Sequence, residues 1–128
     1  MTRRIFQSIC VASISVFLAS AAVILGVLYD DFSEIQMNRL RAQTELAAQG
    51  AAHEGAAYFR DLEAGIYRIT WIGPDGAVLY DTGSDAAGMD SHLGREEIAA
   101  ALRDGYGESV RYSDTLTERL FYTAKRLP

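Results

Sequence analysis

Five polar side chains near expected strand ends and loop edges are the best candidates for chemistry in this chain: Asp81, His92, Arg95, Arg111 and Tyr122. An arginine guanidinium can hold a carboxylate through two parallel hydrogen bonds. The five residues together therefore predict a binding site for a small anion or an organic acid. The alternative is a structural network that ties a loop to a sheet, and the sequence leaves both interpretations open.

Motifs for catalysis or metal binding are missing from the sequence. It contains no nucleophile elbow, phosphate-binding loop or metal-spaced cluster. His53 and His92 have no nearby cysteine and no paired spacing, which argues against zinc. The Asp75-Gly76 pair lacks the alternating acidic positions of a calcium loop. We therefore expect no catalytic residue, metal site or cofactor in this chain.

Two expected hairpins and a short helix would position the candidate residues. Alternating residues predict a strand over 66–72, and Gly-Pro-Asp-Gly predicts a tight turn before a return strand over 77–82. A polar loop and a short helix over 95–104 follow, with Gly105 as the helix stop. Two more strands are expected over 110–114 and 119–126, with a turn over 116–118 between them. The helix residues expected to point inward are Ile98, Ala101 and Leu102.

A long helix is expected to precede the first hairpin. The segment 30–62 has no proline and is rich in Ala, Glu, Gln, Leu and Arg, all of which favour helix. Two apolar rows at helical spacing suggest that one face packs on the domain and a second face contacts something else, such as another copy of the chain. One solvated face is the alternative. The first row comprises Met37, Leu40, Thr44, Ala47, Ala51, Tyr58 and Leu62, and the second comprises Ile35, Ala42 and Leu46.

The N-terminus carries an apolar segment over 5–28 that is long enough to cross the roughly 30 Å hydrocarbon core of a bilayer. Arg3 and Arg4 precede it, so the positive-inside rule places the N-terminus in the cytoplasm and residues 29–128 outside. A cleaved signal peptide is the alternative, because Ala19-Ser20-Ala21 fits a cleavage site. The apolar run continues past that site, which favours an uncleaved anchor.

Charge and cysteine content exclude some classes of protein. The net charge is −5 from 12 basic and 17 acidic residues, and two of the basic residues precede the apolar segment. The remainder therefore carries 10 − 17 = −7, which argues against a nucleic-acid partner. Cys10 is the only cysteine, so no intrachain disulfide can form.

The expected fold class is α+β, in which the long helix covers an antiparallel sheet.

The strand-turn-strand over 68–82 (RITWIGPDGAVLYDT) resembles the first hairpin of the extracytoplasmic PAS-like, or single-Cache, domain of bacterial sensor histidine kinases. The segment 92–98 (HLGREEI) is similar to a pattern of that family, His-x-x-Arg-Pro-Glu, with Glu96 in place of the proline. The segment 105–125 resembles the strand pair that closes the sensor. Three such motifs in this order after a transmembrane helix are more specific than any one alone.

The resemblance implies a signal-sensing input module of a two-component kinase in the bacterial cell membrane. Its regions would be an anchor (1–28), a long helix (29–62) and an incomplete PAS-like domain (63–128) that lacks its last strand. The chain would be the N-terminal part of an ATP-dependent protein histidine kinase, with ATP and Mg²⁺ bound by the missing part. Two copies would pair through their long helices and pass a small-molecule or protein stimulus across the membrane.

Three other interpretations remain open. If the apolar segment is a cleaved signal peptide, the chain could be a secreted enzyme. A chemoreceptor or a cyclic-dinucleotide enzyme could carry a similar sensor. The chain could also be a membrane-anchored interaction or assembly domain without kinase output.

Overall fold

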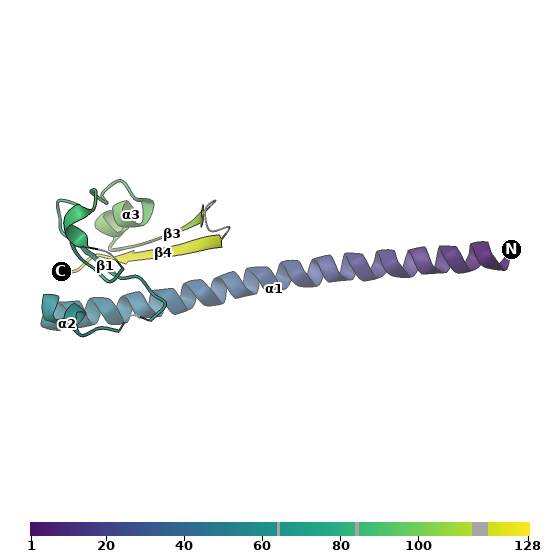
Figure 1. Cartoon of the computed structure of the whole chain (residues 1–128), viewed down its shortest axis with the longest axis horizontal. Coiled ribbons are helices and arrows are strands. Elements are labelled where there is room, and N and C mark those ends of the chain that lie inside the picture. Colours follow the sequence, from purple (N-terminus) through teal and green to yellow (C-terminus); the bar gives the residue numbers. More distant parts are fainter. Residues whose placement is uncertain (64, 84, 114–117) are drawn as a thin grey trace. The chain divides into compact units, whose positions relative to one another are not determined.

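Helix α1 (Thr2–Glu54) is the longest element of the chain (Figure 1). A computed structural model describes residues 1–63, 65–83, 85–113 and 118–128. Within these residues, α1 is the one helix that is long and apolar enough to cross a membrane, although a signal sequence near an N-terminus has the same properties. An N-terminal segment that could span a membrane is therefore confirmed at this coarse level.

The chain divides into two compact units, Met1–Met37 and Asn38–Pro128. The first unit consists entirely of residues from the N-terminus and α1. Its apolar side chains are exposed to the surroundings, among them Phe17 at 71% and Leu25 at 66%. The second unit contains the rest of α1 and all the other elements. The candidate residues all belong to this second unit.

The prediction of one continuous helix over 30–62 is wrong at its C-terminal end. Helix α1 stops at Glu54, and a separate short helix α2 (Ala56–Arg60) follows. Gly55 between them has φ 61° and ψ −138°, a backbone conformation that side chains with a Cβ avoid. The reversal brings Tyr58 back onto Gly50, where an added Cβ would lie 2.6 Å from the ring carbon Cδ2. Gly50 and Gly55 therefore allow the chain to fold back.

Strands β1 (Thr70–Ile72) and β2 (Val78–Asp81) form the first antiparallel hairpin. Its turn is as predicted, because Gly73 N–H donates to Ala77 O at 2.8 Å and Gly76 has φ 84°. The first strand is shorter than the expected 66–72, and Ile66 is 93% exposed. A short 3₁₀ helix, η1 (Ala86–Gly88), comes after β2.

Helix α3 (Glu96–Asp104) is closed by Gly105, as predicted, with φ 90° and a hydrogen bond from Gly105 N–H to Ala101 O at 2.8 Å. Of the residues expected to point inward, Ala101 is buried and Ile98 is half-buried. Leu102 was wrongly expected inside, since it is 42% exposed. Glu97 takes an inward position instead, because β3 supplies polar partners for it.

Strands β3 (Tyr106–Ser113) and β4 (Glu118–Lys125) form the second antiparallel hairpin. Strand β3 starts directly after Gly105, four residues before the predicted start at Val110. Asp114 and most of the predicted turn over 116–118 lie outside the described residues. The described strands pair as two two-stranded sheets, β1–β2 and β3–β4, in place of the single expected sheet.

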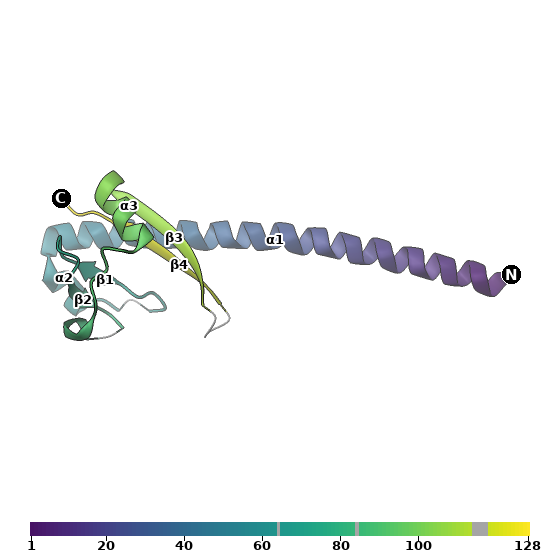
Figure 2. The same ribbon diagram turned by 90° about the horizontal axis from the view of Figure 1, so that it is seen from above.

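The second hairpin lies between two helices. In Figure 1, β3 and β4 lie between α3 and the C-terminal part of α1, and Figure 2 shows that the hairpin crosses this part of the helix obliquely. The α+β class with an antiparallel arrangement and a helix against the strands is thus confirmed. The expected first row on α1 is partly covered, since Leu40, Thr44 and Ala47 are half-buried and Ala51 is buried. The second row is exposed, with Ile35 at 49% and Leu46 at 58%.

Apolar burial in the second unit is concentrated on small side chains and one aromatic cluster. Among the described residues, the buried hydrophobic side chains are Ala51, Phe59 and Ala101. The Phe59 ring lies 5.5 Å from Trp71 and 5.4 Å from Tyr80, measured between ring centroids. The Tyr80 hydroxyl donates to Phe59 O at 2.8 Å. This cluster attaches the first hairpin to α2.

Candidate functional site

Arg111 and Tyr122 are brought together on the α3 side of the second hairpin. The two residues lie on neighbouring strands, and the Arg111 guanidinium carbon is 4.1 Å from the centroid of the Tyr122 ring. Arg111 also forms an ion pair with Glu97 of α3, whose side chain is only 4% exposed. Ser109 donates a hydrogen bond to the same Glu97 oxygen at 2.7 Å. The group can hold a carboxylate, and the carboxylate it holds belongs to the protein.

The Glu97 carboxylate depends on this group for its charge. Burial is the largest influence and opposes ionisation, but it is outweighed by the hydrogen bonds from Ser109, a backbone N–H and Arg111 together with the positive charge of Arg111, so the pKa of Glu97 lies below its ordinary value. Close approach of α3 to β3 requires Gly107, because a Cβ there would lie 2.7 Å from Ala100 Cβ. Gly107 therefore allows α3 to approach β3 closely, and the ion pair between Glu97 and Arg111 joins the two elements.

Asp81 lies in a second polar group on the first hairpin. Its side chain is fully buried and accepts hydrogen bonds from Arg68 Nε at 3.0 Å, Thr70 Oγ1 at 2.6 Å and Gly83 N–H at 2.7 Å. Burial raises the pKa of this carboxyl, but the three donors together lower it by more than burial raises it. The pKa of Asp81 therefore lies below its ordinary value. Asp81 thereby joins both strands of the hairpin to the start of the following loop.

His92 and Arg95 stand at the entrance to α3. His92 is buried, with its Nδ1 atom 2.6 Å from Asp90 O and its backbone N–H bonded to Gly76 O at 3.1 Å. Arg95 is exposed at the helix N-cap, and its backbone N–H donates to His92 O at 3.1 Å. The turn formed by 92–95 ties the loop to the first hairpin and leaves the Arg95 side chain outside.

The five predicted residues thus belong to three groups. Arg111 and Tyr122 share one group with Glu97 and Ser109, Asp81 is in another with Arg68, and His92 with Arg95 forms the loop turn. In the part of the chain that the structure describes, no cluster of three or more His, Cys, Asp or Glu side chains could hold a metal ion.

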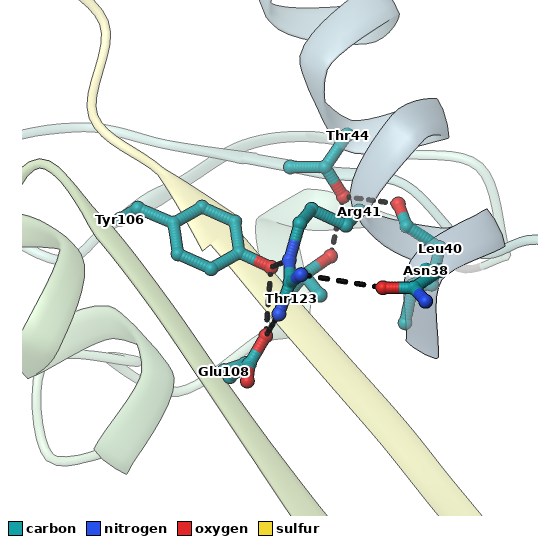
Figure 3. A network of polar contacts seen from close by, with 7 residues as sticks. All are labelled: Asn38, Leu40, Arg41, Thr44, Tyr106, Glu108 and Thr123. Atoms are coloured by element: carbon teal, nitrogen blue, oxygen red, sulfur yellow. Dashed lines mark hydrogen bonds and ion pairs between the residues drawn. The ribbon is translucent and has the colours of Figure 1, made fainter. Parts of the chain in front are cut away.

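A fourth polar group joins α1 to the second hairpin, and the sequence analysis did not single it out. Arg41 Nη2 donates to Glu108 Oε2 at 2.8 Å, and Arg41 Nε donates to the Tyr106 hydroxyl at 3.3 Å (Figure 3). Tyr106 in turn donates to Glu108 at 3.0 Å. Thr44 on α1 also forms a hydrogen bond with Thr123 on the neighbouring strand β4.

A further ion pair extends this group, which we call the α1–hairpin contact: Arg41, Thr44, Glu45, Tyr106, Glu108, Thr123 and Lys125. Glu45 on the helix pairs with Lys125 on β4. The hydrogen bond from Arg41 lowers the pKa of Glu108, and the hydrogen bond from Lys125 lowers that of Glu45. Burial is the main influence that raises the pKa of the Tyr106 hydroxyl. All the contacts that define the group are polar.

The sequence does contain a signal for the α1–hairpin contact. Arg41 and Glu45 are four residues apart, so they lie on one face of a helix. Tyr106 with Glu108, and Thr123 with Lys125, are two residues apart and therefore share one face of each strand. The matching charges become recognisable only when the pairing of β3 with β4 is known.

No protein-family model matches this chain, and no similar protein was found among curated sequences or solved structures.

Proposed function

We propose that the chain is the signal-sensing input module of a two-component sensor histidine kinase in a bacterial cell membrane. Residues 1–28 anchor it with the N-terminus in the cytoplasm, and residues 29–128 face the outside. The chain supplies no catalytic residue. ATP and Mg²⁺ belong to the kinase part of the parent protein.

One observation carries the proposal. The helix that could cross the membrane continues without interruption to Glu54, and its residues 41–45 are bonded to β3 and β4. A change in the position of the second hairpin would therefore act directly on the helix that leads to the membrane. Such a change transmits a stimulus only if the stimulus binds two arrangements with different affinities.

The hairpins support a PAS-like domain whose last strand is supplied by a further segment. Strand β4 pairs with β3 on one side, and a strand that is bonded on one side presents a row of backbone donors and acceptors to another strand. In this proposal a further strand pairs with β4 and joins the second hairpin to the first in one sheet.

A small organic acid or anion is the proposed stimulus, and of the predicted set His92, Arg95, Asp81, Arg111 and Tyr122 it would contact Arg95, because Asp81 and Arg111 already have partners within the protein. The exposed Arg95 is the member of this set with a solvent-facing guanidinium next to a helix N-terminus. A protein partner that presents a carboxylate would use the same chemistry.

Two copies are proposed to pair through α1. The second apolar row, Ile35, Ala42 and Leu46, is exposed on the helix, while the first row is partly covered. An exposed apolar row is a common feature of surfaces that contact another protein. The same row also supports the second candidate function, an anchored interaction or assembly domain without kinase output.

The coding DNA after the codon for Pro128 distinguishes these functions. A second apolar span, a helix with a phosphoacceptor histidine and an ATP-binding domain support the sensor kinase. A methyl-accepting helical domain or a cyclic-dinucleotide enzyme places the module in another receptor class. An in-frame stop codon directly after Pro128 contradicts the kinase and leaves the assembly domain.

A further inference from the structure

We infer that the charges of the α1–hairpin contact fix α1 in a single axial register on the β3–β4 hairpin and prevent it from sliding by one helical turn. The inference goes beyond the proposed function, and only its consequence for signalling rests on that function. It concerns residues of the second unit alone.

The spacing of charges on the helix matches the spacing on the hairpin. Arg41 and Glu45 are about 6 Å apart along the helix axis, and the pairs Glu108↔Thr123 and Tyr106↔Lys125 are successive same-face positions of the hairpin, about 6.8 Å apart. Arg41 bonds Glu108 and Glu45 bonds Lys125. Both ion pairs can therefore form at the same time in one register.

A one-turn slide in either direction brings like charges together. If residue 45 moves to the place of residue 41, the Glu45 carboxylate faces the Glu108 carboxylate. If residue 41 moves to the place of residue 45, the Arg41 guanidinium faces the Lys125 ammonium. One-turn steps of about 5.4 Å are a known way for packed helices to move, and this contact disfavours both of them.

The hydrogen bond between Thr44 and Thr123 adds to the same selection. In the two shifted registers, Ala48 or Leu40 would take the place of Thr44, and neither side chain can bond to the Thr123 hydroxyl. The native register is therefore the one in which both ion pairs and the hydrogen bond between the two threonines form together.

For a signalling chain, the consequence is that residues 38–54 of α1 and the second hairpin move as one body. A stimulus would then tilt or rotate this part of α1 together with β3 and β4, and would not push it along them by a turn.

Disulfide trapping in the full chain tests the register, in a Cys10→Ser background that removes the native thiol. The Thr44 and Thr123 hydroxyls are in direct contact, so cysteines at these positions place two sulfurs within bonding reach. We expect Thr44→Cys with Thr123→Cys to cross-link about fivefold or more faster than the offset pairs, Leu40→Cys or Ala48→Cys with Thr123→Cys. Equal rates for the three pairs would overturn the inference.

Charge inversion separates register from general loss of structure. Arg41→Glu with Glu45→Lys makes both native pairs repulsive and creates attractive pairs in the shifted registers. We expect the 44–123 cross-link to slow and an offset cross-link to speed up. Adding Glu108→Lys and Lys125→Glu should restore the native pattern.

Loss of every cross-link in the helix double variant, followed by recovery in the fourfold variant, also supports charge-held register. An unchanged 44–123 cross-link in the double variant, or no recovery in the fourfold variant, contradicts it. The cross-links report register directly, so a failed kinase proposal leaves this result intact.

Discussion

Arg41 on α1 and Glu108 on β3 are 67 residues apart in sequence, and their Nη2 and Oε2 atoms are 2.8 Å apart. Both side chains remain partly exposed, at 50% and 39%, so solvent weakens their attraction. The pair is therefore better suited to selecting one arrangement than to providing much stability. It connects the second hairpin to the helix whose N-terminal part could span a membrane.

The ion pair between Glu97 and Arg111 makes the fold sensitive to acid. The folded-state pKa of Glu97 is depressed below its ordinary value of 4.5, so its stabilising effect is fully present above about pH 4.5 and is lost as the pH falls through the lower, folded value. Glu97→Gln should reduce the free energy of unfolding at pH 7 by about 1–3 kcal/mol, because Arg111 loses a charged partner. Its stability should also fall less steeply below pH 4.5 than that of the unmodified chain.

Urea unfolding followed by circular dichroism between pH 3 and 7 measures this difference. Glu96→Gln is the matched control, since Glu96 is exposed in the same first turn of α3. It should cost at most about 1 kcal/mol, through the lost interaction with the helix dipole. Parallel pH curves for the unmodified chain and Glu97→Gln would contradict the assigned role.

The fold-back after α1 depends on the positive φ of Gly55. Gly55→Ala should destabilise the second unit by about 1–3 kcal/mol, although an added Cβ would meet no atom within 4 Å. The cost therefore comes from the backbone alone. Gly88→Ala has equally open space and no positive φ, and it should change stability by less than about 0.5 kcal/mol. Thermal unfolding of both variants compares them, and equal effects would be inconsistent with a strained position at Gly55.

Pairing of two chains through the second row predicts a position-dependent cross-link. In membranes and a Cys10→Ser background, Leu46→Cys should give a disulfide-linked dimer on mild oxidation, because residue 46 is 58% exposed on the proposed contact face. Ala47→Cys lies on the partly covered first row and should give much less. Non-reducing gel electrophoresis separates the products. Similar yields at 46 and 47 would remove the support for pairing through this face.

Binding of an organic acid at the loop predicts a role for Arg95 that Arg103 does not share. A binding carboxylate should raise the midpoint of thermal unfolding by mass action. In a panel of mono- and dicarboxylates, Arg95→Gln should abolish any shift, and Arg103→Gln should keep it. Arg103 is a suitable control because it is an exposed arginine on the same helix, paired with Asp104. A shift that survives Arg95→Gln would place binding elsewhere.

Local sequence signals predicted much of the fold. The Gly-Pro-Asp-Gly turn and the Gly105 helix stop occur as expected, since each rests on a backbone conformation that glycine favours. The end of α1 was missed because residues 56–62 have reasonable helix propensity, and residues 56–60 are indeed helical as α2. The break lies before them at Gly55, which has a positive φ, and Tyr58 contacts Gly50 after the chain folds back.

The candidate residues were harder to predict than the elements that carry them. Arg111 and Tyr122 lie together because β3 and β4 pair in the register that places Ser109 opposite Tyr122. The partner of Arg111 is Glu97, which was not among the helix residues predicted to point inward. The α1–hairpin contact likewise joins residues from three elements, and their charges match only in the folded arrangement.

The most direct test of the account is histidine phosphorylation of the complete gene product in membrane vesicles supplied with radiolabelled ATP and Mg²⁺. We predict an acid-labile phosphoryl group whose basal level changes in Arg41→Glu and returns toward the original level in Arg41→Glu with Glu108→Arg. That pattern would connect the α1–hairpin contact to output across the membrane. No acid-labile label, or the same level in all three proteins, would contradict the account.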